Sequence, residues 1–163
     1  MSEKCPTMNG GICTNITIIG KISISDDGMG NIDGVYLPNS NLPFREQRES
    51  PILKEAALQI DEYLLGKRMT FSLSLKTEGT DFQKRVWNEI AKIPYGETAS
   101  YSEIAKRIGS PNAYRAVGNA CNSNPIPLII PCHRVVASNG IGGYGGGLAL
   151  KKRLMDIEGI KYR

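Results

Sequence analysis

Short runs of β-branched and apolar residues in the first half of the chain predict strands. Such runs occupy residues 16–19, 21–25 and 32–37, and the Asp-Asp-Gly-Met-Gly-Asn sequence at 26–31 has the composition of a turn. This succession predicts an antiparallel meander. A further run at 71–75 predicts one more strand.

Apolar residues at helical spacing follow the predicted meander. Ser50 and Pro51 form a good N-cap and first-turn pair, and the helical pattern ends at Gly66. The apolar positions between these points are Ile52, Leu53, Ala56, Ala57, Ile60 and Leu64. A helix on a small antiparallel sheet is the simplest packing, so we expect an α/β N-terminal domain over residues 1–76 and a second domain over 77–163.

The second half of the chain has a mainly helical pattern. Thr80 with Gln83, and Ser100 with Glu103, have the spacing of a capping box, in which two side chains satisfy free amides at a helix start. The Gly-Ser-Pro sequence at 109–111 predicts the end of one helix and the start of the next. Two short helices joined by so tight a turn are typical of a helix-turn-helix, although helical hairpins in ordinary cores share the pattern.

Composition limits the classes of protein that this chain can belong to. The chain has 163 residues, no apolar run of membrane-spanning length and no secretory signal pattern at its N-terminus. We therefore expect an intracellular protein whose four cysteines are thiols. Cys5 and Cys13, with a single histidine elsewhere, are too few ligands for a closed zinc site, so we expect no metal and no cofactor.

Charge is informative through its distribution. A net charge of +4 is compatible with nucleic acid, but many proteins without a polyanionic partner carry as much. Lysine and arginine are numerous in the second half, where phosphate contacts would be expected if this half binds DNA. The alternative, for some of these cations, is a solvated helix face. These cations are Lys84, Arg85, Lys92, Lys106, Arg107, Arg115, Arg134, Lys151, Lys152 and Arg153.

The segment Leu-Ile-Ile-Pro-Cys-His-Arg-Val-Val at 128–136 places Cys132 beside His133, the single histidine of the chain. A thiol becomes a strong nucleophile as the thiolate, so a neighbouring base predicts nucleophilic chemistry. Pro131 predicts a bend that brings the two side chains together or leaves room for one bridging water. The alternative is a short buried strand with an inert cysteine, which the charged Arg134 in the same run disfavours.

The sequences around this core carry a family resemblance. Arg-Ala-Val-Gly at 115–118, Asn-Pro-Ile-Pro at 124–127, Pro-Cys-His-Arg-Val at 131–135 and Gly-Tyr-Gly-Gly-Gly-Leu at 143–148 occur in this order. The set resembles the O6-alkylguanine-DNA alkyltransferase family over about residues 80–159. The resemblance implies a ribonuclease-H-like first domain and a winged helix-turn-helix-like second domain. It also implies repair in a single turnover, in which alkylated guanine is flipped out of duplex DNA and its alkyl group moves irreversibly to the active-site cysteine.

The resemblance assigns catalytic roles to five positions. It makes Cys132 the nucleophile, and His133 the base that acts on it through a water molecule. It makes Glu158 the carboxylate that holds the imidazole, whereas the residue alone reads as an exposed carboxylate at a helix end. Asn124 corresponds to the hinge between the recognition helix and the active-site segment. Tyr101 corresponds to the tyrosine that donates a proton toward guanine and contacts a phosphate.

The resemblance also places one helix against the DNA. Arg115 corresponds to the finger that enters the base stack and fills the place of the flipped nucleotide. The small residues Ala113, Ala116 and Gly118 would allow the helix backbone to approach the minor groove. Tyr114 departs from the family because alanine or proline is often found at its position.

The glycine-rich loop at 140–147 is expected to form a pocket wall rather than a flexible linker. The carbonyls of Cys132 and Val135 would read the exocyclic amine of guanine, and the backbone amide near Gly145 would meet the alkylated oxygen. A serine is common in the family where Gly145 stands, so its hydroxyl contact is absent here. The remaining residues expected to line the pocket are Pro127, Tyr144 and Gly146.

Three other functions remain open at this point. A non-catalytic damage sensor of the alkyltransferase-like kind would carry tryptophan at the position of Cys132. A helix-turn-helix regulator would need a dimerisation element. A cysteine hydrolase would need an oxyanion site. Under the repair hypothesis the partner is double-stranded DNA containing O6-alkylguanine. We expect a monomer without membrane contact, cytoplasmic and nucleoid-associated, or nuclear in a eukaryote.

Overall fold

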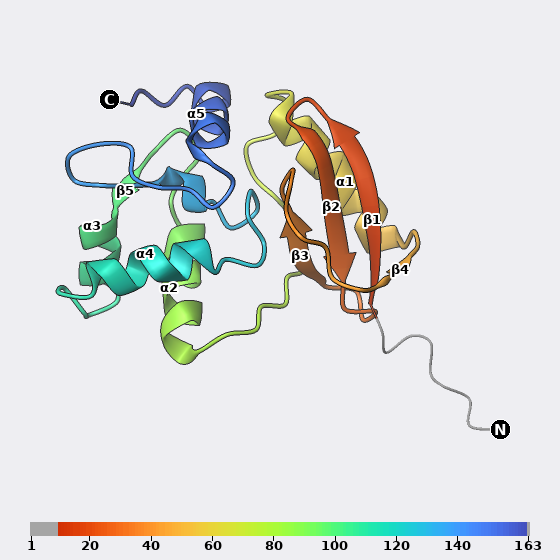
Figure 1. Cartoon of the computed structure of the whole chain (residues 1–163), viewed down its shortest axis with the longest axis horizontal. Helices are drawn as coiled ribbons and strands as arrows, with labels where there is room; N and C mark the ends of the chain where they lie inside the picture. The colour runs from red at the N-terminus through yellow and green to blue at the C-terminus, as the bar shows by residue number, and fades with distance from the viewer. Residues whose placement is uncertain (1–9, 163) are drawn as a thin grey trace.

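The computed structural model describes residues 10–162 of the chain. A small mixed sheet forms the first part of the molecule (Figure 1). The strands, in the order β3-β2-β1-β4, are β1 (Gly11–Thr17), β2 (Gly20–Asp26), β3 (Ile32–Tyr36) and β4 (Glu46–Gln47). The predicted meander is confirmed, because β1 pairs antiparallel with β2 and β2 with β3. The expectation of a purely antiparallel sheet is wrong, since β4 pairs parallel with β1. Its two exposed polar residues gave no strand pattern in the sequence.

One helix, α1 (Pro51–Leu64), packs on this sheet as predicted. The Ser50 hydroxyl accepts a hydrogen bond from the Leu53 amide at 3.2 Å, which satisfies one of the free donors at the helix start. Gly66, with φ of 74°, follows the last turn in the left-handed conformation that glycine adopts without strain. The buried face of the helix is formed by Leu53, Ala56, Gln59, Ile60, Tyr63 and Leu64.

The predicted strand at 71–75 is wrong. Its alternation is real, because Phe71 and Leu73 are half-buried between exposed neighbours. However, the segment contacts the edge strand β3 only around Ile32, whose amide donates to the Ser74 carbonyl at 2.8 Å. An isolated bridge between Ile32 and Leu75 is therefore all that forms. Side-chain alternation shows that one face is buried, but a strand also needs a partner backbone along its length.

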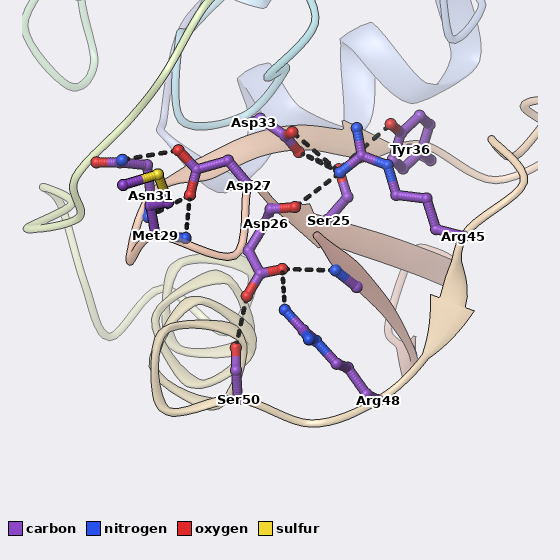
Figure 2. A network of polar contacts seen from close by, with 11 residues as sticks. Ser25, Asp26, Asp27, Met29, Asn31, Asp33, Tyr36, Arg45, Arg48 and Ser50 are labelled. Atoms are coloured by element: carbon purple, nitrogen blue, oxygen red, sulfur yellow. Dashed lines mark hydrogen bonds and ion pairs between the residues drawn. The ribbon is translucent and has the colours of Figure 1, made fainter. Parts of the chain in front are cut away.

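The end of β2 is held by a buried carboxylate, Asp26 (Figure 2). Its Oδ1 accepts from the Gly11 amide at 2.7 Å, and its Oδ2 accepts from the Ser50 hydroxyl at 2.8 Å. Arg48 adds an ion pair at 3.4 Å. One side chain therefore joins the start of β1, the end of β2 and the N-cap of α1.

Helices dominate the second part, which lies beside the sheet in Figure 1. They are α2 (Asp81–Ala91), α3 (Tyr101–Arg107), α4 (Tyr114–Asn122) and α5 (Leu148–Ile157). The short strands β5 (Ala99–Ser100) and β6 (Val135–Val136) pair in parallel, and a short 3-10 helix, η2, spans Cys132–Arg134. The capping box at Thr80 and Gln83 is confirmed with both of its hydrogen bonds. Ser100 caps α3 by accepting from the Glu103 amide at 3.0 Å.

The helix α4 begins later than the Gly-Ser-Pro sequence predicts. The Ser110 amide donates back to the Ala105 carbonyl at 2.9 Å, and Gly109 has φ of 78°. Ser110 therefore closes the end of α3 and does not cap the next helix. A turn follows, and α4 starts at Tyr114 without a side-chain cap.

A continuous buried core joins the two parts of the chain. It runs from the sheet and α1 into α2, α3 and α4. The Trp87 indole donates to the Ala120 carbonyl at 2.8 Å and so links α2 to α4 inside this core. Within the described residues, no helix is both long enough and apolar enough to cross a membrane.

Candidate active site

Cys132 opens the 3-10 turn directly after Pro131, and it is 6% exposed. The Asn124 side chain positions the segment that leads to it. Asn124 Nδ2 donates to the Ile130 carbonyl at 2.8 Å, and its Oδ1 accepts from the Ile126 amide at 2.9 Å. These two bonds fix the chain between the end of α4 and the cysteine.

His133 and Glu158 form a fully buried pair. His133 Nε2 lies 2.5 Å from Glu158 Oε2. The carboxylate can only accept, so Nε2 carries the proton and Nδ1 keeps its lone pair. Nδ1 is buried and has no hydrogen-bond partner among residues 10–162. The pair therefore presents a nitrogen that can accept a proton, on the residue next to the thiol.

Glu158 lies at the end of α5, and the alternative of an exposed carboxylate there is wrong. Its Oε1 accepts from Arg134 Nε at 2.8 Å and from the Gly96 amide at 2.9 Å. Burial by itself would raise the pKa of Glu158, but the hydrogen bond and charge of His133, followed by the bonds from Arg134 and Gly96, lower it to about 2. The carboxylate is therefore ionised throughout the physiological range.

Burial disfavours the charged forms of both reacting groups. It lowers the pKa of His133, and Glu158 opposes this effect only in part. Burial also raises the pKa of the Cys132 thiol, against the opposing effects of the Asn124 hydrogen bond and the Lys151 charge. The resting pair is thus a neutral thiol and a neutral imidazole, which is the protonation state that general-base activation requires.

Two cations expected at phosphates are buried instead. Arg134 donates from Nη1 to the Ile93 carbonyl at 2.7 Å and is paired with Glu158. Lys151 is 0% exposed, and its Nζ donates to the carbonyls of Val135, Ile141 and Gly143 at 2.7, 2.7 and 2.9 Å. The expectation that these two side chains contact DNA is therefore wrong.

Lys151 instead holds the glycine-rich loop against β6. Burial lowers its pKa to about 8, although the nearby Cys132 and Cys121 act in the opposite direction. The burial of Lys151 had a signal in the sequence, because the apolar Leu154 and Met155 follow it at the three- and four-residue spacing of one helix face. All three residues are buried in α5.

Tyr63 was not predicted as a site residue. Its hydroxyl donates to Glu158 Oε2 and lies 3.0 Å from His133 Nε2. It comes from α1, 70 residues before the histidine. In the sequence it lies within the predicted helix, but it is not among the apolar positions that define the helical pattern.

A cavity of about 230 Å³ opens beside Cys132. The second part supplies most of the wall, including Pro127, Tyr144, Gly145 and Gly146, which were expected there, together with Asn124 and Cys121. The first part supplies Val35, Tyr36, Leu37 and Ser40, which the sequence did not indicate.

Two residues of the expected pocket differ from the others. Val135 is buried outside the wall, and its carbonyl accepts from Lys151. The Tyr144 hydroxyl is buried without a hydrogen-bond partner in the described part of the chain.

The residues expected at DNA lie on and near α4. Arg115 and Ala116 are exposed, as is Tyr114, whose ring lies 6.0 Å from the Arg115 guanidinium. Ala113 is half-buried before the helix. Gly118 is also half-buried.

Tyr101 links α4 to the glycine-rich loop. A Cβ at Gly118 would lie 3.9 Å from the Tyr101 ring, which places that tyrosine against α4. The Tyr101 hydroxyl donates to the Gly143 carbonyl at 3.4 Å. Tyr101 therefore lies between the exposed helix and the loop that borders the cavity.

No group of three or more His, Cys, Asp or Glu side chains in residues 10–162 is arranged to hold a metal ion. Cys13 is half-buried in β1, where its Sγ accepts a hydrogen bond from Asn15. Cys5, the other cysteine considered as a metal ligand, lies outside the described residues.

Comparison with known proteins gives a consistent result. Residues 81–160 match the family model described as 6-O-methylguanine DNA methyltransferase, DNA binding domain. A methylated-DNA–protein-cysteine methyltransferase from Methanosarcina barkeri is 56% identical over 106 residues, which is 64% of this chain and 67% of that protein. A constitutive one from Bacillus subtilis is 48% identical over 120 residues, which is 72% of this chain and 73% of that protein.

Solved structures agree over most of the chain. The crystal structure of Mycobacterium tuberculosis OGT in complex with DNA matches with a TM-score of 0.85 and 38% identity, covering 91% of this chain and 92% of that one. The O6-methylguanine-DNA methyltransferase from Pyrococcus kodakaraensis matches with a TM-score of 0.57 and 26% identity, covering 91% and 99%.

Proposed function

Because this chain belongs to the 6-O-methylguanine DNA methyltransferase family, we propose that it repairs DNA by moving the alkyl group of O6-alkylguanine to Cys132. The observation that carries this proposal is the geometry around the thiol. Cys132 borders a cavity, and the adjacent His133 is held by Glu158 with its second nitrogen unpartnered among the described residues. A nucleophile, a base and a group that orients the base are the parts that such a transfer needs.

The reaction proceeds by displacement at the alkyl carbon. His133 Nδ1 takes the thiol proton, directly or through one water molecule, and the Cys132 sulfur attacks the carbon. The S–C bond forms as the C–O bond breaks, and guanine takes up a proton, for which Tyr101 is the candidate donor. A thioether resists hydrolysis, so each protein molecule acts once and restores one guanine.

The lesion lies inside the base stack, so repair of duplex DNA requires the nucleotide to be flipped out at a cost of about a few kcal/mol. We assign this task to α3 and α4, which we interpret as the helix-turn-helix of a winged domain over residues 77–163. Arg115 is exposed on the first turn of α4, where it can replace the flipped base. The exposed Tyr114 and Ala116 flank it, and the small Ala113 and Gly118 allow close approach of the backbone.

The first part of the chain, residues 1–76, corresponds in this proposal to a ribonuclease-H-like domain. The flipped guanine would enter the cavity between Pro127 and Tyr144, near the backbone of Gly145 and Gly146. The carbonyl of Cys132 would read its exocyclic amine, whereas Val135, expected to share this task, lies outside the cavity wall with its carbonyl bonded to Lys151. We propose a monomer acting on double-stranded DNA in the cytoplasm, or in the nucleus of a eukaryote.

Mass spectrometry after incubation with a duplex containing O6-methylguanine tests the proposal. We expect one methyl group per protein molecule, on the peptide that contains Cys132, and none in Cys132→Ser. Methylation of Cys13 or Cys121 instead would show that the nucleophile is misassigned. Tight binding of the lesion without transfer would favour the damage sensor, and tight binding of one undamaged sequence would favour the regulator.

A further inference from the structure

Tyr63 brings the first part of the chain into the catalytic network. It lies in the last turn of α1 and is fully buried. Its hydroxyl donates to Glu158 Oε2, the same oxygen that faces His133 Nε2. Among the described residues, no other side chain of the first part hydrogen-bonds to Glu158 or His133.

We propose that Tyr63 is a positioning residue that fixes the Glu158 carboxylate and the protonation of the His133 ring, so that alkyl transfer depends on a side chain from outside the DNA-binding half. This inference rests on the proposed function, because it gives Tyr63 a task in activating Cys132. It concerns how the base is held, and it adds no group that touches the substrate.

The argument begins with the single proton of the tyrosine. Burial first, and then the Glu158 charge, raise the pKa of Tyr63, so the phenol keeps its proton. That proton goes to Glu158 Oε2, and the phenol oxygen then presents lone pairs to His133 Nε2 at 3.0 Å. Two acceptors, the carboxylate and the phenol oxygen, therefore face Nε2, which favours the tautomer with the proton on Nε2 and the lone pair on Nδ1.

The rest of the carboxylate shell shows why the hydroxyl matters. Arg134 and Gly96 satisfy Oε1, whereas Oε2 receives only a longer contact of 3.3 Å from Arg134 besides those of His133 and Tyr63. Without the phenol, more of the negative charge on Oε2 would act on the imidazole. Charged histidine would become more favourable, and its pKa would rise. A protonated imidazole cannot take the thiol proton.

The test is Tyr63→Phe, with Tyr95→Phe as the matched control. Tyr95 packs edge-on against Tyr63, with ring centroids 6.1 Å apart, but its hydroxyl donates to the Ile157 carbonyl at 3.2 Å. Both changes remove one hydroxyl in the same region, and only the first removes a contact with Glu158. We would measure single-turnover alkyl transfer from free O6-benzylguanine and from an O6-methylguanine duplex across a range of pH, together with duplex affinity and thermal unfolding.

We expect Tyr63→Phe to slow both transfers by the same factor of about 10 to 100 near neutral pH, less than the full 10²–10⁴ that a general base supplies. The acid limb of the rate profile should move to higher pH, and duplex affinity should stay unchanged. An unshifted profile, or a rate loss equal to that of Tyr95→Phe, would overturn the assignment. If wild-type protein transfers no alkyl group at all, the proposed function fails, which is a separate outcome.

Nuclear magnetic resonance of the imidazole in the wild type and in Tyr63→Phe gives a second test of the inference. The chain has one histidine, so its ring nitrogens need no assignment by mutation. We expect the Nε2–H tautomer in the wild type at neutral pH and a larger charged fraction in Tyr63→Phe. An Nδ1–H tautomer in the wild type would contradict the proposal even if the variant did not fold.

Discussion

Each part of the molecule contains a buried carboxylate that joins distant segments, and the two differ in their partners. Asp26 accepts from a backbone amide, a serine hydroxyl and Arg48, none of which changes its protonation state near neutral pH (Figure 2). Glu158 accepts from His133, whose neutral imidazole can take up a proton from the thiol.

Burial and full hydrogen bonding therefore do not by themselves mark a catalytic carboxylate. Asp26 fixes the geometry of a strand end and a helix start. Glu158 fixes a base beside a thiol at the wall of a cavity. The chemistry of the partner, and access to a space where a substrate fits, separate the two.

Glu158→Gln breaks the second network and should have the largest effect. The amide keeps the shape of the side chain but loses the charge that stabilises the imidazolium form during proton transfer. We expect transfer from free O6-benzylguanine to slow by about 10²–10⁴-fold, which single-turnover kinetics would measure. A rate within about twofold of the wild type would remove Glu158 from the mechanism.

The same variant should change the stability of the protein in acid. The pKa of Glu158 in the folded protein is about 2, below its usual value. The unfolded chain therefore takes up this proton first, and the contribution of Glu158 to stability is lost as the pH falls from about 4.5 toward 2. The unfolding free energy of the wild type should therefore fall with acidification over this range, and that of Glu158→Gln should lack this decrease.

Asp26→Asn breaks the first network and should separate stability from chemistry. Replacing the charged acceptor weakens the bonds to Gly11, Ser50 and Arg48, and hydrogen bonds to a charged group contribute about 1.5–3 kcal/mol each. We expect the free energy of unfolding in urea to fall by roughly 2 kcal/mol, with the transfer rate of the folded protein unchanged. Slower transfer at unchanged stability would mean that the two networks are coupled.

The sequence allowed local structure to be predicted where side chains signal it directly. The Ser50 and Thr80 caps marked the starts of α1 and α2 correctly because capping depends on residues three positions apart. The strand β4 was missed and residues 71–75 were taken for a strand, because pairing depends on which backbone lies alongside. Ser110 closes α3 and does not open α4, because its amide donates back to the Ala105 carbonyl.

The site shows the same limit. Family resemblance indicated Cys132, His133, Glu158 and Asn124, and the structure places them together. Tyr63 could not be found this way, because it comes from the half that the resemblance did not cover. Arg134 and Lys151 were misread as phosphate contacts for another reason: a cation in the sequence does not show whether its charge is buried against carbonyls or exposed to solvent.

Arg115 lies outside both networks, and its removal should have the narrowest effect. Its side chain is exposed on α4 and contacts the Tyr114 ring. Because its proposed task is to fill the stack after the base has left, Arg115→Ala should slow repair of duplex DNA by about tenfold and leave unfolding unchanged. Transfer from free O6-benzylguanine should also be unchanged, since that substrate has no stack to leave. Equal slowing with both substrates would place Arg115 in the chemical step, and the flipping role would have to be assigned to another residue of α4.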